Sequence, residues 1–456
     1  MIAPTSPIIP PAPKVHVKDL PEWRLLLEFI RNPISILPDH AFDALISRRR
    51  VFGLDFMLLS DLDGVRHVLT TATEKYRRFV SARRVLAPLV GDKGLFLAAG
   101  TQWRRQRRML APVFTPENVG ALVPHFMAAA MSLTDSLNGS RCANLSLAFQ
   151  EATLEAVLRA LFSLPHTESR GRIAAMVRHY LSGPGRPNIL DGLARTEQSF
   201  AFATRMRRSF RRSWSDTIDN IVASRQNSPP SAPHRDLLSL LIAARDSESG
   251  EALSDVEVRD QCATMLLAGY ETTSRLLFWT TYLVTLDTAA QNRLRDEFAA
   301  HPPERVSTLA DLLNWPLSYQ TLLESLRLYP PIPHVARESI ADDVVAGEPV
   351  RPKIKVWISP WVIHRHRKFW HHPTAFMPDR FAGKAPLWTN DGAFLPFGAG
   401  PRICIGATFA MAEAQIMLAT LLSRFKIALD DARPVLPVAK VTTAPSHEPL
   451  FRLERV

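Results

Sequence analysis

Apolar positions recur at helical spacing over most of the middle of the chain, and strand-like alternation is confined to short pieces. Helical periodicity dominates residues 104–300 and marks a short stretch from Trp23 to Phe29. Strands are predicted for Val51 to Ser60, around Val344 to Ile358, and near the C-terminal end of the chain. The body contains no internal repeat and no linker rich enough to divide it. The pattern predicts one mainly α-helical domain with small peripheral β-sheets.

Three helices can be placed by their ends. Ser254 and Glu257 form a capping box, and from there to about Asp287 the chain has no proline and is apolar nearly all round. A helix of that length measures about 45–50 Å and must cross the core. A second helix ends at Tyr329, because the two prolines that follow cannot continue it. A third begins at or just after Cys404.

The first residues are rich in proline. The prolines between Pro4 and Pro13 predict an extended, poorly packed arm over residues 1–18, which leaves residues 19–456 as a single domain. No apolar run approaches the 18 or so residues that span a bilayer, and the start lacks a signal-peptide pattern. We therefore expect a soluble, cytoplasmic protein without a transmembrane anchor.

Composition and charge narrow the function only a little. With 46% hydrophobic and 22% charged residues the chain is an ordinary globular protein. The net charge of +11 comes partly from arginines crowded at 104–108 and 207–212, which we interpret as solvated helix faces. No nucleic-acid motif accompanies them, so a nucleic-acid partner is not expected. Three cysteines without a C-x-x-C exclude a disulfide framework, and Cys142 and Cys262 are interpreted as small buried hydrophobes.

The third cysteine lies in a loop built for chemistry. The stretch from Phe397 to Gly406 reads FGAGPRICIG, in which two glycines and a proline form a tight turn before a helix. The loop delivers the Cys404 sulfur to a helix N-terminus, where free amides and the helix dipole stabilise a thiolate. Arg402 adds a positive charge nearby, and Phe397 can shield the sulfur from water. Such a thiolate could be a nucleophile, a redox sensor or a metal ligand.

The same stretch resembles the haem-binding signature of the cytochromes P-450, F-x-x-G-x-R-x-C-x-G, at every fixed position. The resemblance implies the cytochrome P-450 fold, with haem b as cofactor and Cys404 as the proximal ligand of its iron. It also implies that Phe397 tunes the sulfur, that Arg402 pairs with a haem propionate, and that Gly406 belongs to the haem-binding loop.

A second group of residues resembles the structural triad of that family. Glu324 and Arg327 form an E-x-x-R on one helical face, and Pro378-Asp379-Arg380-Phe381 resembles the family's P-E-R-F. The resemblance implies a buried triad of Glu324, Arg327 and Arg380. We interpret it as structural, because removing one member would leave a buried charge without its partner.

Two residues of the long helix are candidate catalytic groups. Glu271 and Thr272 lie in a segment that resembles the family's A-G-x-D/E-T-T, and a polar pair inside an apolar helix is costly without a function or firm partners. The resemblance implies that Thr272 holds oxygen at the iron and that Glu271 relays protons. The alternative is that Thr272 only bonds back to a carbonyl one turn earlier.

Three further residues are implied in haem binding. Trp103 and Arg107 lie one helical turn apart, so both can reach one anionic group. By resemblance that group is a haem propionate, and Arg337 is another arginine at a position where the family often binds a propionate. A tryptophan of the core and an arginine of the surface are the alternatives.

The resemblance implies a haem-thiolate monooxygenase. It would insert one oxygen atom of O₂ into a C–H bond or C=C of a hydrophobic small molecule. Too few residues follow Cys404 for a fused reductase, so NAD(P)H would act through a ferredoxin or flavodoxin and its reductase. Arg104 to Arg108 could steer such an acidic partner. A peroxygenase that uses H₂O₂ and a non-catalytic haem-thiolate binding protein stay open, and a monomer is expected.

The substrate pocket can be assigned only to segments. We expect it to be lined by residues from Val80 to Leu97, the region near Ser182 to Asn188, the middle of the long helix, Ile332 to Ala336, and the turn from Thr442 to Ser446. Apolar residues in these segments suggest an apolar cavity. Glu271, where many soluble members have Asp, resembles the branch that oxidises fatty acids.

Overall fold

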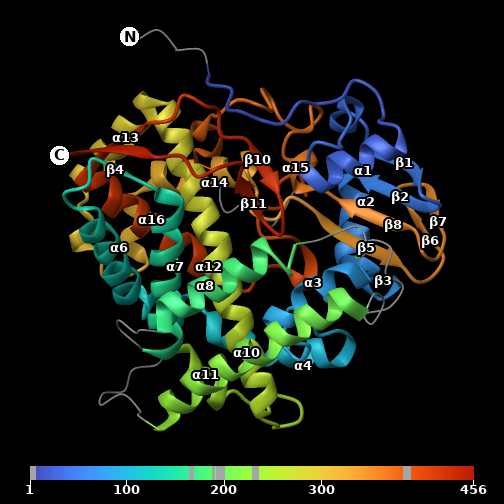
Figure 1. Cartoon of the computed structure of the whole chain (residues 1–456), viewed down its shortest axis with the longest axis horizontal. Coiled ribbons are helices and arrows are strands. Elements are labelled where there is room, and N and C mark those ends of the chain that lie inside the picture. Colours follow the sequence, from blue (N-terminus) through green and yellow to red (C-terminus); the bar gives the residue numbers. More distant parts are fainter. Residues whose placement is uncertain (1–6, 164–168, 187–190, 192–200, 228–235, 384–391) are drawn as a thin grey trace.

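One long helix organises the molecule. The computed structural model describes residues 7–163, 169–186, 191, 201–227, 236–383 and 392–456. Its α12 (Asp255–Leu286) crosses the centre of the body, with helices packed along its length (Figure 1). The predicted capping box is present: Ser254 Oγ accepts from the Glu257 N–H, and the Glu257 carboxylate accepts from the Ser254 N–H at 3.0 Å. At 32 residues the helix is about 48 Å long, which confirms the predicted length.

The helices that pack directly on α12 include α7 (Leu145–Phe162), α14 (Pro316–Leu328) and α16 (Ala407–Arg424). The end of α14 at Leu328 and the start of α16 just after Cys404 confirm the two other predicted helix ends. The remaining helices are α1 (Glu22–Arg31), α2 (Leu62–Arg66), α3 (Val80–Val90), α4 (Gly100–Leu110), α5 (Pro116–Gly120), α6 (Val123–Leu137), α8 (Ser169–Ser182), α10 (Ala201–Asn227), α11 (Leu237–Ala243), α13 (Thr288–Ala300) and α15 (Pro360–Ile363).

The β-structure is peripheral, as predicted. A five-stranded sheet has the order β1-β2-β8-β5-β3, in which only β2 and β8 are parallel. Its strands are β1 (Ile46–Val51), β2 (Leu54–Leu59), β8 (Lys355–Ile358), β5 (Val335–Ser339) and β3 (Tyr76–Arg77). A three-stranded sheet and two hairpins contain β4 (Cys142–Ala143), β12 (Phe451–Arg455), β9 (Phe425–Leu429), β10 (Pro437–Ala439), β11 (Thr443–Pro445), β6 (Asp343–Val345) and β7 (Glu348–Val350).

The strand predicted for Val51 to Ser60 is the second half of a hairpin. Its first half, β1, has the sequence ISRRRV and was not predicted. A run of three arginines is more typical of a loop than of a strand. However, β1 is an edge strand, where charged side chains face solvent and discourage pairing with a further strand. The strand is therefore stabilised by its partner β2 rather than by its own pattern.

The described part of the arm is extended, but it is better packed than the sequence suggests. The Phe376 N–H donates to the Ile8 carbonyl at 2.8 Å, and the Tyr329 hydroxyl donates to the Pro11 carbonyl at 2.7 Å. Further on, the Asp39 N–H donates to the His16 carbonyl. Proline lacks an N–H but keeps its carbonyl, so a proline-rich segment can still be held by donors from the body. The division at residue 18 stays a prediction.

Candidate functional site

The Cys404 loop is closed by its own backbone. The Cys404 N–H donates to the Phe397 carbonyl at 2.9 Å, and the Ile403 N–H donates to the Gly400 carbonyl at 3.0 Å. Gly400 has φ +69°, and a Cβ on it would lie 2.2 Å from the Leu69 carbonyl oxygen. A side chain here would collide with backbone as well as adopt a strained conformation, so glycine is required.

The Cys404 sulfur has two stabilising neighbours. It keeps accessible surface, yet desolvation by the surrounding protein raises the pKa of its thiol, while the Gly406 N–H and the charge of Arg107 act in the opposite direction. An amide donor and a guanidinium would favour the thiolate that a metal ion binds.

Three arginines gather beside this loop without a carboxylate among them. Desolvation and the charges of Arg337 and Arg402 lower the pKa of Arg78 to about 9. Desolvation and the charge of Arg337 lower the pKa of Arg402 to about 10. Desolvation also lowers the pKa of Arg337. A guanidinium stays protonated in proteins, so these directions mean that the folded chain holds three partly buried charges at an energetic cost.

The three arginines have more N–H donors than they use in hydrogen bonds within the described residues. Arg402 donates from Nη2 to the Ala98 carbonyl at 3.0 Å and lies 4.4 Å from the centre of the Trp103 ring, but its buried Nη1 has no partner. Arg78 lies over a phenylalanine ring and its buried Nε has no partner. Within the described part of the chain none of the three forms an ion pair with Asp or Glu.

These residues fit the implied cofactor. Unpaired donors on several guanidinium groups match the two carboxylates of a haem, because charged arginines bind carboxylates tightly and often bidentately. The Cys404 sulfur with its amide and cationic neighbours matches an axial thiolate ligand. The anion and the metal would therefore be held by adjacent parts of one site.

The predicted catalytic threonine lies in the middle of α12, which is continuous there. Thr272 Oγ1 donates to the Ala268 carbonyl at 2.5 Å. This is the bond to a carbonyl one turn earlier that the sequence analysis gave as the alternative to a catalytic role. The neighbouring Gly269 lets α7 approach closely, since a Cβ there would lie 2.6 Å from a methyl group of Val157. Thr272 is half-buried, and the hydrogen bond of its hydroxyl is exposed. Its catalytic role stays a prediction.

Glu271 is held by donors on two elements. Its Oε1 accepts from Arg275 Nε at 3.0 Å and from Thr442 Oγ1 at 2.8 Å. Arg275 is one turn further along α12, whereas Thr442 belongs to the turn between β10 and β11. The carboxylate of the predicted acid–alcohol pair is thus tied to the C-terminal hairpin, a link that the sequence pattern does not reveal.

The three residues of the predicted triad lie together. Arg327 donates from Nε and Nη2 to the Glu324 carboxylate at 2.7 Å, and Arg380 Nε donates to it at 3.1 Å. The Met377 N–H adds a fourth donor at 2.8 Å. Arg327 also donates hydrogen bonds to backbone carbonyls, including that of His364 at 2.8 Å. Every charge in this group has a partner.

The prediction that the two arginine clusters are solvated helix faces holds only in part. Arg104, Arg208 and Arg212 are exposed, but other members are paired with acids. Arg105 donates twice to the Glu257 carboxylate at 2.8 Å, and Arg108 donates to Asp246 at 3.1 Å. In the second cluster Arg207 is buried and donates to Asp191 at 2.6 Å. Sequence spacing shows the charge of a segment but not the acid that another element brings to it.

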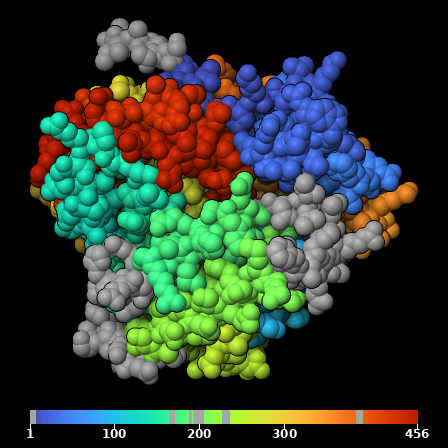
Figure 2. Space-filling view, viewed as in Figure 1, coloured from blue at the N-terminus to red at the C-terminus, as the bar shows by residue number. Residues whose placement is uncertain are grey.

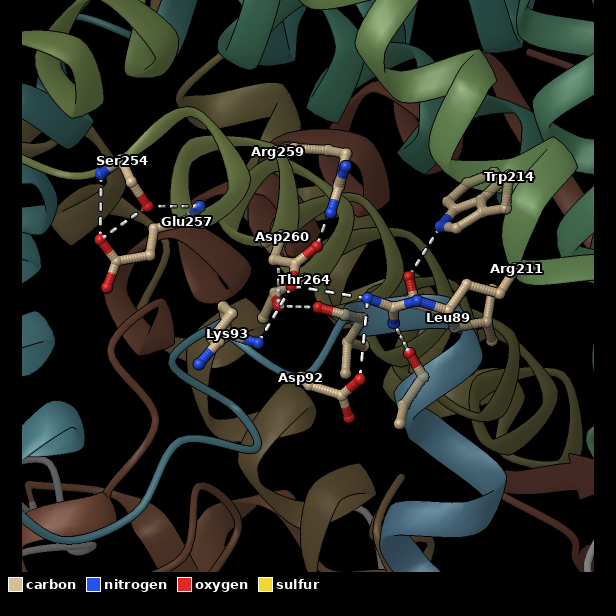
Figure 3. A network of polar contacts seen from close by, with 12 residues as sticks. Leu89, Asp92, Lys93, Arg211, Trp214, Ser254, Glu257, Arg259, Asp260 and Thr264 are labelled. Carbon is tan, nitrogen blue, oxygen red and sulfur yellow. Dashed lines mark hydrogen bonds and ion pairs between the residues drawn. The ribbon is translucent and has the colours of Figure 1, made fainter. Parts of the chain in front are cut away.

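A polar network connects α3, α10 and α12 (Figure 3). Asp260 of α12 accepts from the Lys93 N–H at 3.0 Å and lies 3.8 Å from Arg211 of α10. Next to them, Trp214 Nε1 donates to the Leu89 carbonyl at the end of α3 at 2.7 Å (Figure 3). These contacts hold two of the helices that border the predicted substrate region against the central helix.

Several segments predicted to line the substrate pocket do meet at α12. The Leu95 N–H donates to Gln261 Oε1 at 3.0 Å, and Thr442 contacts Glu271 as described. Residues 187–190, which contain part of the predicted region near Ser182 to Asn188, lie outside the described residues. The pocket itself stays a prediction.

Sequence reasoning missed two residues near the site. Arg78 lies beside β3 in no recognisable motif, and only its cationic neighbours identify it. Glu413 of α16 is fully buried, neither carboxylate oxygen has a hydrogen-bond partner, and burial raises its pKa well above the usual range, opposed by nearby Thr273. Its position nine residues after Cys404, in an apolar helix, was a signal that could have been noticed.

Comparison with known proteins decides the family. The family model described as Cytochrome P450 matches residues 46–452. The chain belongs to the cytochrome P450 family. As a P450 it is an enzyme of the monooxygenase class, and haem, O₂, an organic substrate and a redox partner follow from membership. No helix of the described residues is both long and apolar enough to cross a membrane.

Relatives of this P450 come from distant organisms. It is 27% identical to the chloroplastic protein LUTEIN DEFICIENT 5 of Arabidopsis thaliana, over 94% of this chain and 75% of that protein. It is 31% identical to cytochrome P450 4F2 of Homo sapiens, over 76% and 71%. The crystal structure of the cytochrome P450 CYP102L1 superposes with a TM-score of 0.82 at 21% identity, covering 98% of this chain and 100% of that one. The cyanobacterial CYP120A1 with bound retinoic acid gives 0.80 at 22%, covering 99% and 100%. These structures confirm the predicted fold.

Proposed function

We propose that this P450 is a haem-thiolate monooxygenase that uses haem b and inserts one oxygen atom of O₂ into a C–H bond or C=C of a hydrophobic small molecule. The observation that carries the proposal is the Cys404 loop beside three arginines that have no carboxylate partner among the residues that the structure describes. Cys404 would bind the haem iron through its sulfur. Arg78, Arg107, Arg337, Arg402 and Trp103 would hold the propionates. Phe397 would shield the sulfur, and Gly406 would stabilise its charge, to which Arg107 also contributes.

The chain's own residues would supply proton transfer and orientation. Bound haem supplies the activation of O₂ and the oxidation of the substrate. Thr272 offers a hydroxyl that donates to the Ala268 carbonyl, and it could exchange that bond for one to a bound ligand. Glu271 would pass protons towards it, with Arg275 and Thr442 fixing the resting position of the carboxylate. Apolar walls would exclude water and orient the substrate.

Electrons would come from NAD(P)H through a ferredoxin or flavodoxin and its reductase. Two arginines of the 104–108 cluster are already neutralised, Arg105 by Glu257 and Arg108 by Asp246. Arg104, in the same cluster, is exposed. Steering of an acidic partner therefore rests on Arg104 rather than on the whole cluster. We keep a monomeric, cytoplasmic enzyme as part of the proposal.

The decisive experiment concerns the bond from sulfur to iron. Reduced protein in carbon monoxide should show the far red-shifted absorption maximum of a thiolate-ligated haem, and Cys404→Ala should abolish the shift. Cys262→Ala is the matched control, because that thiol is fully buried elsewhere in the core. A preparation that takes up no haem, or a shift that survives Cys404→Ala, would refute the proposal.

A second measurement separates the modes of oxidation. Turnover of a substrate found by its spin-state shift should require NAD(P)H with redox proteins and should be much slower with H₂O₂ alone. Faster turnover with H₂O₂ would make the enzyme a peroxygenase. Ligand-induced spectral shifts without any product in either system would make it a binding protein.

A further inference from the structure

The N-terminal arm covers a cavity of about 90 Å³. Residues 12–15 of the arm form one wall. Another wall consists of buried apolar side chains, those of Ile34, Leu37, Phe42 and Trp361. In Figure 2 the described start of the chain (dark blue) lies at the outer edge of the molecule, so a ligand could reach the cavity without opening the core. A water molecule needs only about 10–15 Å³ of such space, so a molecule of several heavy atoms has room here.

The cavity is bordered by a buried charge that has no counter-ion. Arg365 lines the cavity and is only 5% exposed. Its Nη2 donates to the Leu328 carbonyl, and its guanidinium lies 3.6 Å from the centre of the Trp361 ring. Its buried Nη1 has no hydrogen-bond partner among the described residues. Desolvation, and then the charge of Arg327, lower the pKa of Arg365 to about 9. The folded chain therefore holds this charge at an energetic cost.

Two further basic residues line the cavity, and only one of them is paired. Arg367 forms ion pairs with Asp39 and Asp43. Lys14 of the arm is exposed and forms no hydrogen bond or ion pair with another described residue. No Asp or Glu is among the described residues that line the cavity. The cavity thus presents two unpaired cationic groups to a ligand and no lining carboxylate that would repel an anion.

We propose that this cavity binds a small carboxylic acid with a short apolar body. The carboxylate would accept hydrogen bonds from Arg365 Nη1 and Lys14 Nζ, and the apolar body would lie against Ile34 and Leu37. An apolar cavity with a few polar groups at one place is typical of a site for a small organic ligand. An inorganic anion would lose its water to walls that are mostly apolar. No described residue of the Cys404 loop or of α12 lines the cavity, so the site is separate from the site of oxidation.

A bound ligand would also hold the arm on the body. Backbone carbonyls of the arm accept hydrogen bonds from the body on both sides of residues 12–15, at Pro11 and at His16. Between these two points the arm meets the body across the cavity. The ligand would fill that interval and contact both. Because a ligand that binds only the folded state stabilises it, the melting temperature should rise with ligand concentration.

The test is binding of butyrate to the full-length holoenzyme, measured by saturation-transfer NMR and by the melting temperature. Butyrate should bind saturably and raise the melting temperature. Butan-1-ol has the same apolar body without a charge and butylamine has the opposite charge, so neither should do so at the same ionic strength. Arg365→Met should weaken butyrate binding by about tenfold or more, and Lys14→Met by about threefold. Ala12→Trp, which fills the cavity from the arm, should abolish it.

The matched control is Lys18→Met, because Lys18 is exposed on the same arm and does not line the cavity. This variant should bind butyrate like the unchanged enzyme. Lys14→Met and Ala12→Trp change exposed residues, so they test the site even where Arg365→Met fails to fold. Absence of saturable binding, equal binding of butyrate and butan-1-ol, or equal effects of Lys14→Met and Lys18→Met would overturn the proposal.

The ferric haem spectrum separates this cavity from the site of oxidation. Butyrate bound under the arm should leave the spectrum unchanged. A spectral shift whose butyrate dependence is the same in the Ala12→Trp variant would place the carboxylate beside the haem, and it would also overturn the proposal.

Discussion

The arginines around Glu324 and the arginines beside Cys404 are both largely withdrawn from solvent, but they differ in what surrounds them. Around Glu324, two guanidinium groups and a backbone amide converge on one carboxylate. Beside Cys404, Arg78, Arg337 and Arg402 lie close to one another, and no described Asp or Glu pairs with them. The first group is complete within the chain. The second is stable only at an energetic cost, which an anion from outside the chain would relieve.

The difference separates a structural role from a binding role without reference to any motif. Both groups contain arginines that the family resemblance marks, Arg327 and Arg380 in one group and Arg337 and Arg402 in the other. Only the balance of charge and hydrogen bonds distinguishes them. The group around Glu324 has its charges paired, whereas the group beside Cys404 has N–H donors without a partner among the described residues. Substitutions should therefore have opposite consequences in the two groups, and the following predictions test that contrast.

The largest effect is expected in the complete group. Glu324→Gln should lower the free energy of unfolding by about 3–5 kcal/mol, because two buried guanidinium groups lose their counter-charge. Chemical denaturation of the holoenzyme measures this. Asp379→Asn is the control: its ion pair with Arg293 is largely exposed, so its loss should cost under about 1 kcal/mol. Similar losses in both variants would show that the triad is not special.

The next effect depends on pH. His364 is buried and its Nε2 accepts from the Leu395 N–H at 2.8 Å, just before the Cys404 loop. Desolvation, and then the charges of Arg327 and Arg365, lower its pKa from 6.5 to about 3. The unfolded state therefore binds a proton below pH 6.5 while the folded state does not, so stability falls as the pH decreases towards 3.

At pH 5 the His364 contribution amounts to about 2 kcal/mol lost relative to pH 7. His364→Gln keeps an acceptor for the Leu395 amide but cannot titrate. The difference in unfolding free energy between the enzyme and this variant should therefore change by that amount between pH 7 and pH 5. A constant difference would mean that His364 does not titrate in this range.

A smaller effect is expected for the arginines beside Cys404. For the apoprotein, the change in unfolding free energy should have the opposite sign to that of Glu324→Gln. Arg402→Leu should leave the apoprotein as stable or more stable, because it removes one of three repelling charges. The same change should weaken haem binding by about tenfold, since a propionate loses a charged donor. Unfolding of the apoprotein and titration with haem measure the two effects separately. A less stable apoprotein with unchanged haem affinity would place Arg402 in the structural class.

The smallest effect is expected for Arg104, which is exposed, unlike the arginines of the two groups. Arg104→Glu should slow reduction by an acidic redox partner by about two- to fivefold at low salt and hardly at all at high salt. Arg108→Gln is the comparison, because its charge is already balanced by Asp246 and Glu248. Reduction rates that ignore both Arg104→Glu and ionic strength would disprove steering.

Sequence reasoning placed the elements whose signals are local. The ends of α12 and α14 and the start of α16 follow from a capping box, a pair of prolines and a glycine-rich loop. It failed where a partner strand or an acid from elsewhere decides the outcome. The arginine-rich strand β1 was missed, and Arg105, Arg108 and Arg207 were taken for solvated residues although each has a carboxylate partner.

By itself, the sequence determined the helical framework, the loop that presents Cys404 and the family to which the chain belongs, because these depend on contiguous residues and fixed spacing. Tertiary structure alone decided which charges are paired. Glu271 is held by Thr442, 171 positions away in sequence, and Arg78 joins Arg337 and Arg402 from a separate segment. Charge pairing acts over a few ångströms in space whatever the separation along the chain, so only the folded chain shows which arginines are paired and which are left for a ligand.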